Sequence, residues 1–193
     1  QIPMYSSFED GLKMKGMIFT HFIELVEDKF GFEMADDIIE SANLLSGGAY
    51  TSIGTYDHTE LLELIKHLSE ATGVPAEDLI QVFTEHLFEA FVKDYPKFFE
   101  AVDNCFDFLN SIEDTVHVEV KKLYPDAELP TFEPNIESDS KMTLIYTSKR
   151  PFSAVAYGLI KGSASYYKEH ITIELEDLST PKLTRVVFTL NKH

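Results

Sequence analysis

The segment from Tyr146 to Arg150 brings together residue types suited to holding an anionic ligand. It ends a run of residues that predicts a β-strand over 141–148. Successive side chains on a strand point to opposite faces, so Tyr146, Ser148 and Arg150 should share one face. A phenol, a hydroxyl and a guanidinium in a row form an array of donors, and the arginine fork suits carboxylates. The segment predicts a clamp for a ligand with two nearby carboxylates, although it also fits an ordinary strand end with an exposed arginine.

A second candidate is His117, which lies beside Val116 and Val120 in an apolar stripe of helical spacing. A neutral imidazole that faces an apolar interior can be an axial ligand of haem iron. A histidine at the margin of a core is, however, more often a structural residue without any ligand. The position alone therefore leaves both interpretations open.

Several common site motifs are absent from the sequence, namely G-x-S-x-G, the P-loop, G-x-G-x-x-G and H-E-x-x-H. His86 and Glu89 share a predicted helix, but a di-iron site needs matching glutamates on other helices, so they are expected to be a surface pair. The histidines form no close-spaced cluster, and most are expected at the surface. They are His21, His58, His67, His86, His117, His170 and His193. The single cysteine, Cys105, excludes an intrachain disulfide, covalent c-type haem and any metal site built from several cysteines.

Length and charge narrow the class of protein further. The chain has 193 residues, 16 Lys and Arg against 33 Asp and Glu, and a formal net charge of -17. This charge argues against binding to nucleic acid and to an anionic membrane surface. No apolar run approaches the roughly 18 residues of a membrane span, and no signal peptide is evident, so a cytoplasmic location is expected.

The hydrophobic pattern changes from helical to strand-like along the chain, which predicts an α+β fold of helices followed by a small antiparallel sheet. The segment 125–140 contains three prolines and several acidic residues and is expected to be a connecting loop. A helical break is expected near Asn110 and Ser111. Helices are predicted over 17–30, 35–45, 58–71, 76–92, from Pro96, over 106–123 and over 153–167, and strands over 141–148, 171–175 and 183–190.

In combination, these features resemble the haem nitric oxide/oxygen binding (H-NOX) family, which includes bacterial gas sensors and the haem domain of soluble guanylate cyclase. The resemblance rests on His117, on Pro130 after Leu129 and on the Y-x-S-x-R pattern of Tyr146, Ser148 and Arg150. It also includes the segments Met14-Lys15-Gly16 and Gly158-Leu159-Ile160-Lys161-Gly162. It extends from Met14 to about Leu190. Residues 1–13 are then an extension or a cloning remnant, and 14–193 a single domain, helical to about 124 and containing the sheet from about 125.

The resemblance implies a non-covalent haem b between the helical part and the sheet part. His117 would be the axial iron ligand, and Tyr146, Ser148 and Arg150 would hold the haem propionates. Pro130 would press on the porphyrin and distort it. Lys149 and Arg150 would also supply local positive charge in an otherwise acidic chain.

The resemblance also addresses the choice of gas. Oxygen-binding members carry a distal tyrosine at the position of Val155, and the other aligned pocket positions are Ile18, Phe22, Leu87 and Phe91. Bound O₂ gains from a hydrogen-bond donor, and none of these side chains has one. A wholly apolar pocket that binds NO and CO and discriminates against O₂ is therefore expected.

The resemblance implies signalling rather than catalysis. In the family, NO weakens the iron–histidine bond, strain against the proline relaxes, and the helical part shifts against the sheet part. The region carries no effector, so a separate histidine kinase or cyclic-di-GMP enzyme is the expected partner, with the acidic surface as a docking face. Two alternatives remain: an O₂-binding haem protein or peroxidase, and a haem-free interaction module of the same fold.

Overall fold

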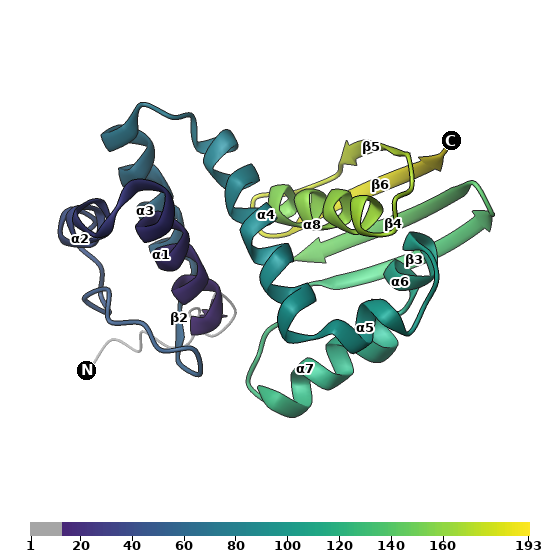
Figure 1. Cartoon of the computed structure of the whole chain (residues 1–193), viewed down its shortest axis with the longest axis horizontal. Helices are drawn as coiled ribbons and strands as arrows, with labels where there is room; N and C mark the ends of the chain where they lie inside the picture. The colour runs from purple at the N-terminus through teal and green to yellow at the C-terminus, as the bar shows by residue number, and fades with distance from the viewer. Residues whose placement is uncertain (1–12) are drawn as a thin grey trace, which may run out of the picture.

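A computed structural model describes residues 13–193 of the chain. The first part is a group of helices (Figure 1), beside which lies a short two-stranded antiparallel sheet. Its elements are β1 (Lys13–Lys15), α1 (Gly16–Phe30), α2 (Phe32–Ser41), β2 (Thr55–Asp57) and α3 (His58–Thr72). The predicted N-terminal extension lies outside the described residues, apart from Lys13, which begins β1.

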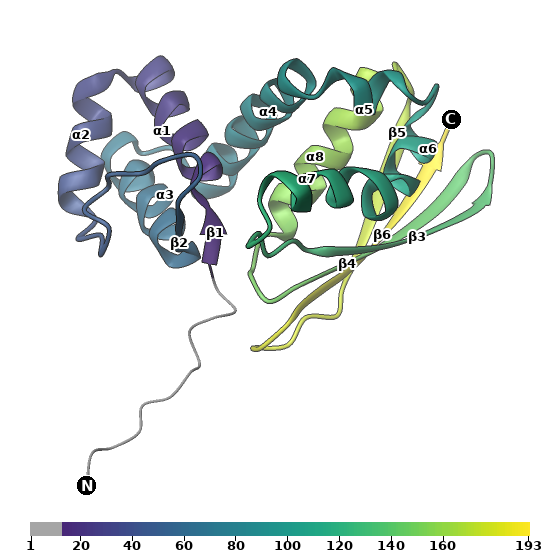
Figure 2. The ribbon, with the colours of Figure 1, turned by 90° about the horizontal axis from the view of Figure 1, so that it is seen from below.

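The second part is a four-stranded antiparallel sheet with helices packed on it (Figure 2). The strand order is β3-β4-β6-β5. The strands are β3 (Thr131–Ser138), β4 (Lys141–Ser148), β5 (Ile171–Asp177) and β6 (Thr184–Lys192). The helices are α5 (Pro96–Glu100), α6 (Cys105–Asn110), α7 (His117–Leu123) and α8 (Ser153–Tyr166).

The long helix α4 (Ala76–Asp94) runs between the two groups and contacts both (Figure 1). It packs on α1 and α3 on one side and on α8 on the other. Its close approach to α8 depends on Gly158 and Gly162, where an added Cβ would lie 2.3 Å from Thr84 Oγ1 and 2.8 Å from the Phe88 ring. This crowding accounts for two glycines in a helix, where glycine is normally unfavourable.

Two hydrophobic cores correspond to the two groups of elements. The first joins α1–α4 around Phe19, Phe22 and Leu64, and the second joins α8 and the sheet around Leu144 and Phe188. Along β4 the burial alternates strictly, with every second side chain buried. This alternation shows that one face of the sheet is covered by helices, as expected for a sheet packed on one side.

The predicted α+β class is confirmed, and most predicted helices and strands lie where expected. The assignment of 125–140 to a loop is wrong, because Thr131–Ser138 forms β3. Pro134 lies within this strand, opposite Leu144. A proline cannot donate a ladder hydrogen bond, but β3 is an edge strand and tolerates it.

The break predicted near Asn110 has an unusual form. After α6 the chain continues as a π-helical turn, η1 (Ile112–Val116), and then as α7. The backbone amide of His117 donates to the carbonyl of Ile112, five residues earlier. Such π-turns often occur at functional sites because they rotate the side chains that follow. Within residues 13–193, none of the helices combines the length and apolar character that a membrane crossing requires.

Candidate functional site

A cavity of about 270 Å³ lies where the first group of helices meets α7, α8 and the sheet. It is lined by α1, α4, α7, α8 and β4, by the segment 127–130 and by the side chain of Phe132 on β3. Its walls are mostly apolar. The cavity is slightly smaller than the roughly 300–1,000 Å³ common for small-molecule sites.

Most of the residues predicted for the site come together at this cavity, although they are distant in the sequence. The predicted residues that line it are Ile18, Phe91, His117, Pro130, Tyr146, Arg150 and Val155. Ser148 lies one strand repeat from Tyr146, on the same buried face of β4. Tyr146 and Ser148 therefore have the shared orientation expected from the period of a strand, and Arg150, just after the end of β4, lines the same cavity.

Phe22 and Leu87, also predicted for the pocket, lie elsewhere. Both are almost fully buried in the first hydrophobic core, and the ring of Phe22 packs edge-on against Phe83 at 5.4 Å. The cavity reaches only the N-terminal end of α1 and the C-terminal end of α4, at Ile18 and Phe91. One turn further into each helix, the side chains contact the core and not the cavity.

His117 has a fixed orientation in the cavity wall. Its Nδ1 lies 3.1 Å from Glu113 Oε1, and the same oxygen accepts a hydrogen bond of 2.7 Å from the backbone amide of Phe132. The η1 turn places Glu113 four residues before His117 on one face. Because Nδ1 bonds to the carboxylate, Nε2 is the nitrogen that a metal in the cavity would take.

The protonation state of His117 also suits metal binding. Burial lowers its pKa; the charge and hydrogen bond of Glu113 oppose this effect, and Lys121 adds to it. The net shift favours the neutral imidazole, which is the form that binds metals. The sequence analysis missed the role of Glu113, although a carboxylate one helical turn before a histidine was a readable signal.

Arg150 is buried, with its guanidinium at the cavity wall. It donates to the carbonyl of Lys13 at 2.6 Å and forms a second short hydrogen bond to the carbonyl of Glu128. An arginine has five N–H donors, so these two bonds leave others for a ligand. The backbone amide of Arg150 also donates to Ser148 Oγ at 3.1 Å.

Tyr146 completes the strip. Its side chain is 3% exposed, and burial raises the pKa of its phenol, while a hydrogen bond with Ser148 and the charge of Arg150 oppose the increase. The phenol therefore stays protonated and can donate a hydrogen bond at neutral pH. The three side chains form one connected polar edge on an otherwise apolar cavity.

Two tyrosines that the sequence analysis did not identify, Tyr95 and Tyr124, also line the cavity. These two residues follow the ends of α4 and α7, where helical periodicity no longer predicts which way a side chain points. Burial raises the pKa of Tyr95, and its interaction and hydrogen bond with Tyr124 raise it further. The expected pocket without donors concerns the positions of Ile18, Phe22, Leu87, Phe91 and Val155, and it stays a prediction.

The expectation that the histidines form no close-spaced cluster is also wrong. His21 on α1 and His86 on α4 lie close together beside Glu24. The two histidines are far apart in the sequence, and only the packing of α1 against α4 brings them together.

The fold and the cavity define a ligand-binding module in which one oriented histidine lines a mostly apolar cavity edged by cationic and hydroxyl donors. Comparison with known families gives the class. The model of the haem-NO-binding family matches residues 15–175, and the chain belongs to this family. Members of the family bind haem, and their H-NOX domain is a ligand-binding sensor domain.

Solved structures agree with this assignment. The Fe(II) unliganded H-NOX protein from K. algicida is 42% identical, with a TM-score of 0.85 over 93% of this chain and 97% of that chain. The H-NOX from Shewanella woodyi, in its IWP-051-bound Fe(II)CO state, is 43% identical, with a TM-score of 0.79 over 93% of this chain and 95% of that chain. No curated protein matches the chain.

Proposed function

We propose that the cavity binds haem b without covalent attachment and that His117 is the axial ligand of its iron. The support is the geometry of His117, whose Nδ1 bonds to Glu113 and whose pKa is lowered by burial. The mostly apolar lining suits the porphyrin ring, and Pro130 and Ile18 would contact it as part of that lining. The fixed ring of Pro130 offers a rigid surface against which a porphyrin would distort.

Tyr146, Ser148 and Arg150 are proposed to hold the two haem propionates. Tyr146 and Ser148 share the buried face of β4, Arg150 follows the end of that strand, and the arginine fork suits a carboxylate. The bonds of Arg150 to the carbonyls of Lys13 and Glu128 keep the guanidinium at the cavity edge. The clamp would then orient the haem relative to His117.

The proposed function is that of a nitric oxide sensor that also binds CO and discriminates against O₂. Ferrous haem supplies the iron to which these gases bind. The observation that carries the choice of gas is Val155, which lines the cavity and has no hydrogen-bond donor. O₂ on ferrous iron needs such a donor far more than NO does. The S. woodyi relative in its Fe(II)CO state supports CO as a ligand.

Tyr95 and Tyr124 also line the cavity, where they follow the ends of α4 and α7. The family resemblance assigns the distal tyrosine of oxygen-binding members to the position of Val155 instead.

Exposure of the reduced protein to air tests the choice of gas. The haem-loaded protein is reduced, passed into air-saturated buffer and followed by absorption spectroscopy. We expect the ferrous spectrum to decay to the ferric one without a stable O₂ complex, whereas CO gives a stable complex. Persistent bands of an O₂ complex would contradict the proposed selectivity.

Signalling is proposed to reach a separate effector, a histidine kinase or a cyclic-di-GMP enzyme. Helix α4 packs on α1 and α3 and also on α8, so a movement of the first group of helices against the sheet would pass through it. The acidic surface of the chain would attract a basic face on the partner. The sensor itself is proposed to have no catalytic residues and a cytoplasmic location.

Glu113 gives a prediction about the iron ligand. Replacing Glu113 with alanine removes the oxygen that holds His117 Nδ1. Haem affinity should then fall by roughly 10–100-fold, as is usual when a residue that hydrogen-bonds to a metal ligand is lost. Haem transfer to an apo-acceptor measures the affinity, and resonance Raman should show a lower iron–histidine stretching frequency. E119A removes an exposed carboxylate of α7 that pairs with Lys122 and should change neither value. Equal effects of both substitutions would contradict the orienting role of Glu113.

A further inference from the structure

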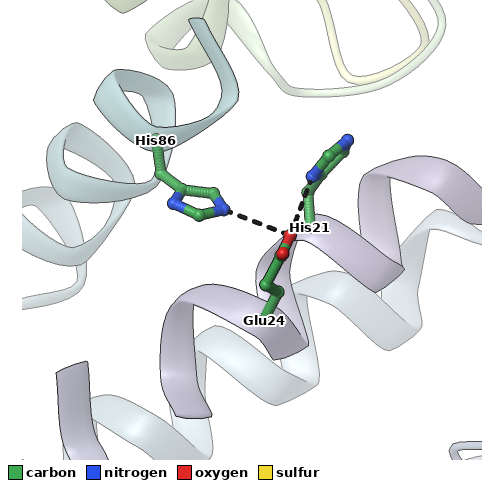
Figure 3. Close-up of side chains that lie close together, drawn as sticks. All are labelled: His21, Glu24 and His86. Atoms are coloured by element: carbon green, nitrogen blue, oxygen red, sulfur yellow. Dashed lines mark hydrogen bonds and ion pairs between the residues drawn. The ribbon is translucent and has the colours of Figure 1, made fainter. Parts of the chain in front are cut away.

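A cluster of two imidazoles and one carboxylate lies between α1 and α4 (Figure 3). His21 and Glu24 are three residues apart on α1 and therefore share one side of that helix. His86 approaches the same carboxylate from α4. One ligand atom from each of the three residues lies within 4.8 Å of the other two.

The separations within the cluster are close to those of a bound metal. Glu24 Oε2 lies 3.2 Å from His21 Nδ1 and 3.6 Å from His86 Nε2. In a tetrahedral zinc site with bonds of about 2.0–2.2 Å, neighbouring ligand atoms are about 3.3–3.6 Å apart. The second of these separations lies within this range and the first is only slightly shorter, while the ligand atoms of the two histidines lie within 4.8 Å of each other.

The state of His86 is a second, independent observation. Its Nε2 is inaccessible to solvent and forms no hydrogen bond, since the nearest carboxylate oxygen is too distant at 3.6 Å. A buried ring nitrogen without a hydrogen bond is uncommon, because most buried polar atoms are hydrogen-bonded. A metal ion between the two rings would provide a direct bond to this nitrogen, which now has only the longer contact with Glu24.

The surroundings allow a metal to enter and to complete its coordination. The side chains of His21 and His86 are 18% and 22% exposed, whereas that of Glu24 is 58% exposed. Water can therefore reach the carboxylate side and supply a fourth ligand. Two imidazole nitrogens and one carboxylate are donors that zinc accepts readily.

We propose that His21, Glu24 and His86 form a zinc site that fixes α1 to α4. This site is separate from the haem cavity but close to it in the fold. Ile18, one turn before His21, lines the cavity, as does Phe91, five residues after His86. A bound ion would set the separation of the two helices that carry these cavity residues.

Zinc binding by the haem-loaded protein, without any affinity tag, tests the proposal. Equilibrium dialysis followed by elemental analysis should show one zinc ion per chain, saturating at micromolar concentration. H86Q and, separately, E24Q should weaken this binding at least tenfold. Because Glu24 is largely exposed, E24Q should keep the fold even if H86Q does not, and circular dichroism checks both variants.

A matched control comes from α3. His67 lies near Glu63 and Glu70, with separations of 3.7 and 3.9 Å that involve two different ring nitrogens, so these residues cannot hold one ion together. H67Q should therefore bind zinc like the unmodified chain, and zinc should raise the melting temperature of both but not that of E24Q. No saturable binding, or unchanged binding in both H86Q and E24Q, would overturn the proposal. The latter result would place the ion elsewhere, for example at His170 and His193, whose rings are 5.3 Å apart.

Discussion

Replacing Val155 with tyrosine should raise the affinity of the ferrous protein for O₂ by roughly 10–100-fold, equivalent to a hydrogen bond of about 1.4–2.8 kcal/mol. Val155 is on α8 and lines the cavity. A tyrosine there would bring a phenol donor to a wall that has no donor at this position. O₂ affinity is measured as the ratio of association and dissociation rates after flash photolysis of the CO complex.

V155F is the matched control, because it adds the same ring without the hydroxyl. We expect V155F to leave O₂ affinity low and to alter CO and NO binding about as much as V155Y does. If V155F raised O₂ affinity as much as V155Y, the ring and not the donor would be responsible. Unchanged O₂ binding in V155Y would count against the proposed position of residue 155 beside the gas.

Removing the proposed iron ligand should have the largest effect on the haem itself. H117G should lower haem affinity by roughly 100-fold or more. Loss of the ligand itself should reduce affinity more than the 10–100-fold that is typical when a residue hydrogen-bonded to a metal ligand is lost. Imidazole added in millimolar concentration should enter the vacated space and restore much of the binding. The ferrous Soret band and haem transfer to an apo-acceptor report both results.

H67G is the control for this experiment, because His67 is a half-buried histidine on α3, away from the cavity. It should retain haem fully and show no response to imidazole. A ferrous spectrum of H117G identical to that of the unmodified protein would show that another residue binds the iron. Haem loss that imidazole does not reverse would indicate a structural role for His117 instead.

The polar strip was predictable because its order depends only on the period of a strand. Tyr146, Ser148 and Arg150 follow one another at intervals of two residues. The strand β4, which ends at Ser148, is a central strand with one covered face. The strand β3 was not predictable in the same way. Its proline and acidic residues resemble a loop, and only its position at the edge of the sheet makes Pro134 acceptable.

Features formed by contacts between distant segments could not be inferred from helical periodicity. Phe22 follows Ile18 by four residues and seemed to share its surroundings, but the cavity ends between them. Tyr95 and Tyr124 reach the same cavity from two helix ends that are distant in the sequence. The contact of His21 with His86 likewise depends on how α1 crosses α4. Glu113 differs from these examples, because it lies only four residues before His117 and this spacing can be read directly from the sequence.

The central claim is that His117 holds the iron of a haem whose gas ligand is NO. The most direct measurement is anaerobic titration of the ferrous protein with NO, followed by absorption and electron paramagnetic resonance spectroscopy. We predict a shift of the Soret band and the three-line nitrogen hyperfine pattern that accompanies loss of the bond between iron and His117. A protein that binds no haem, or whose ferrous spectrum does not change with stoichiometric NO, would contradict the account.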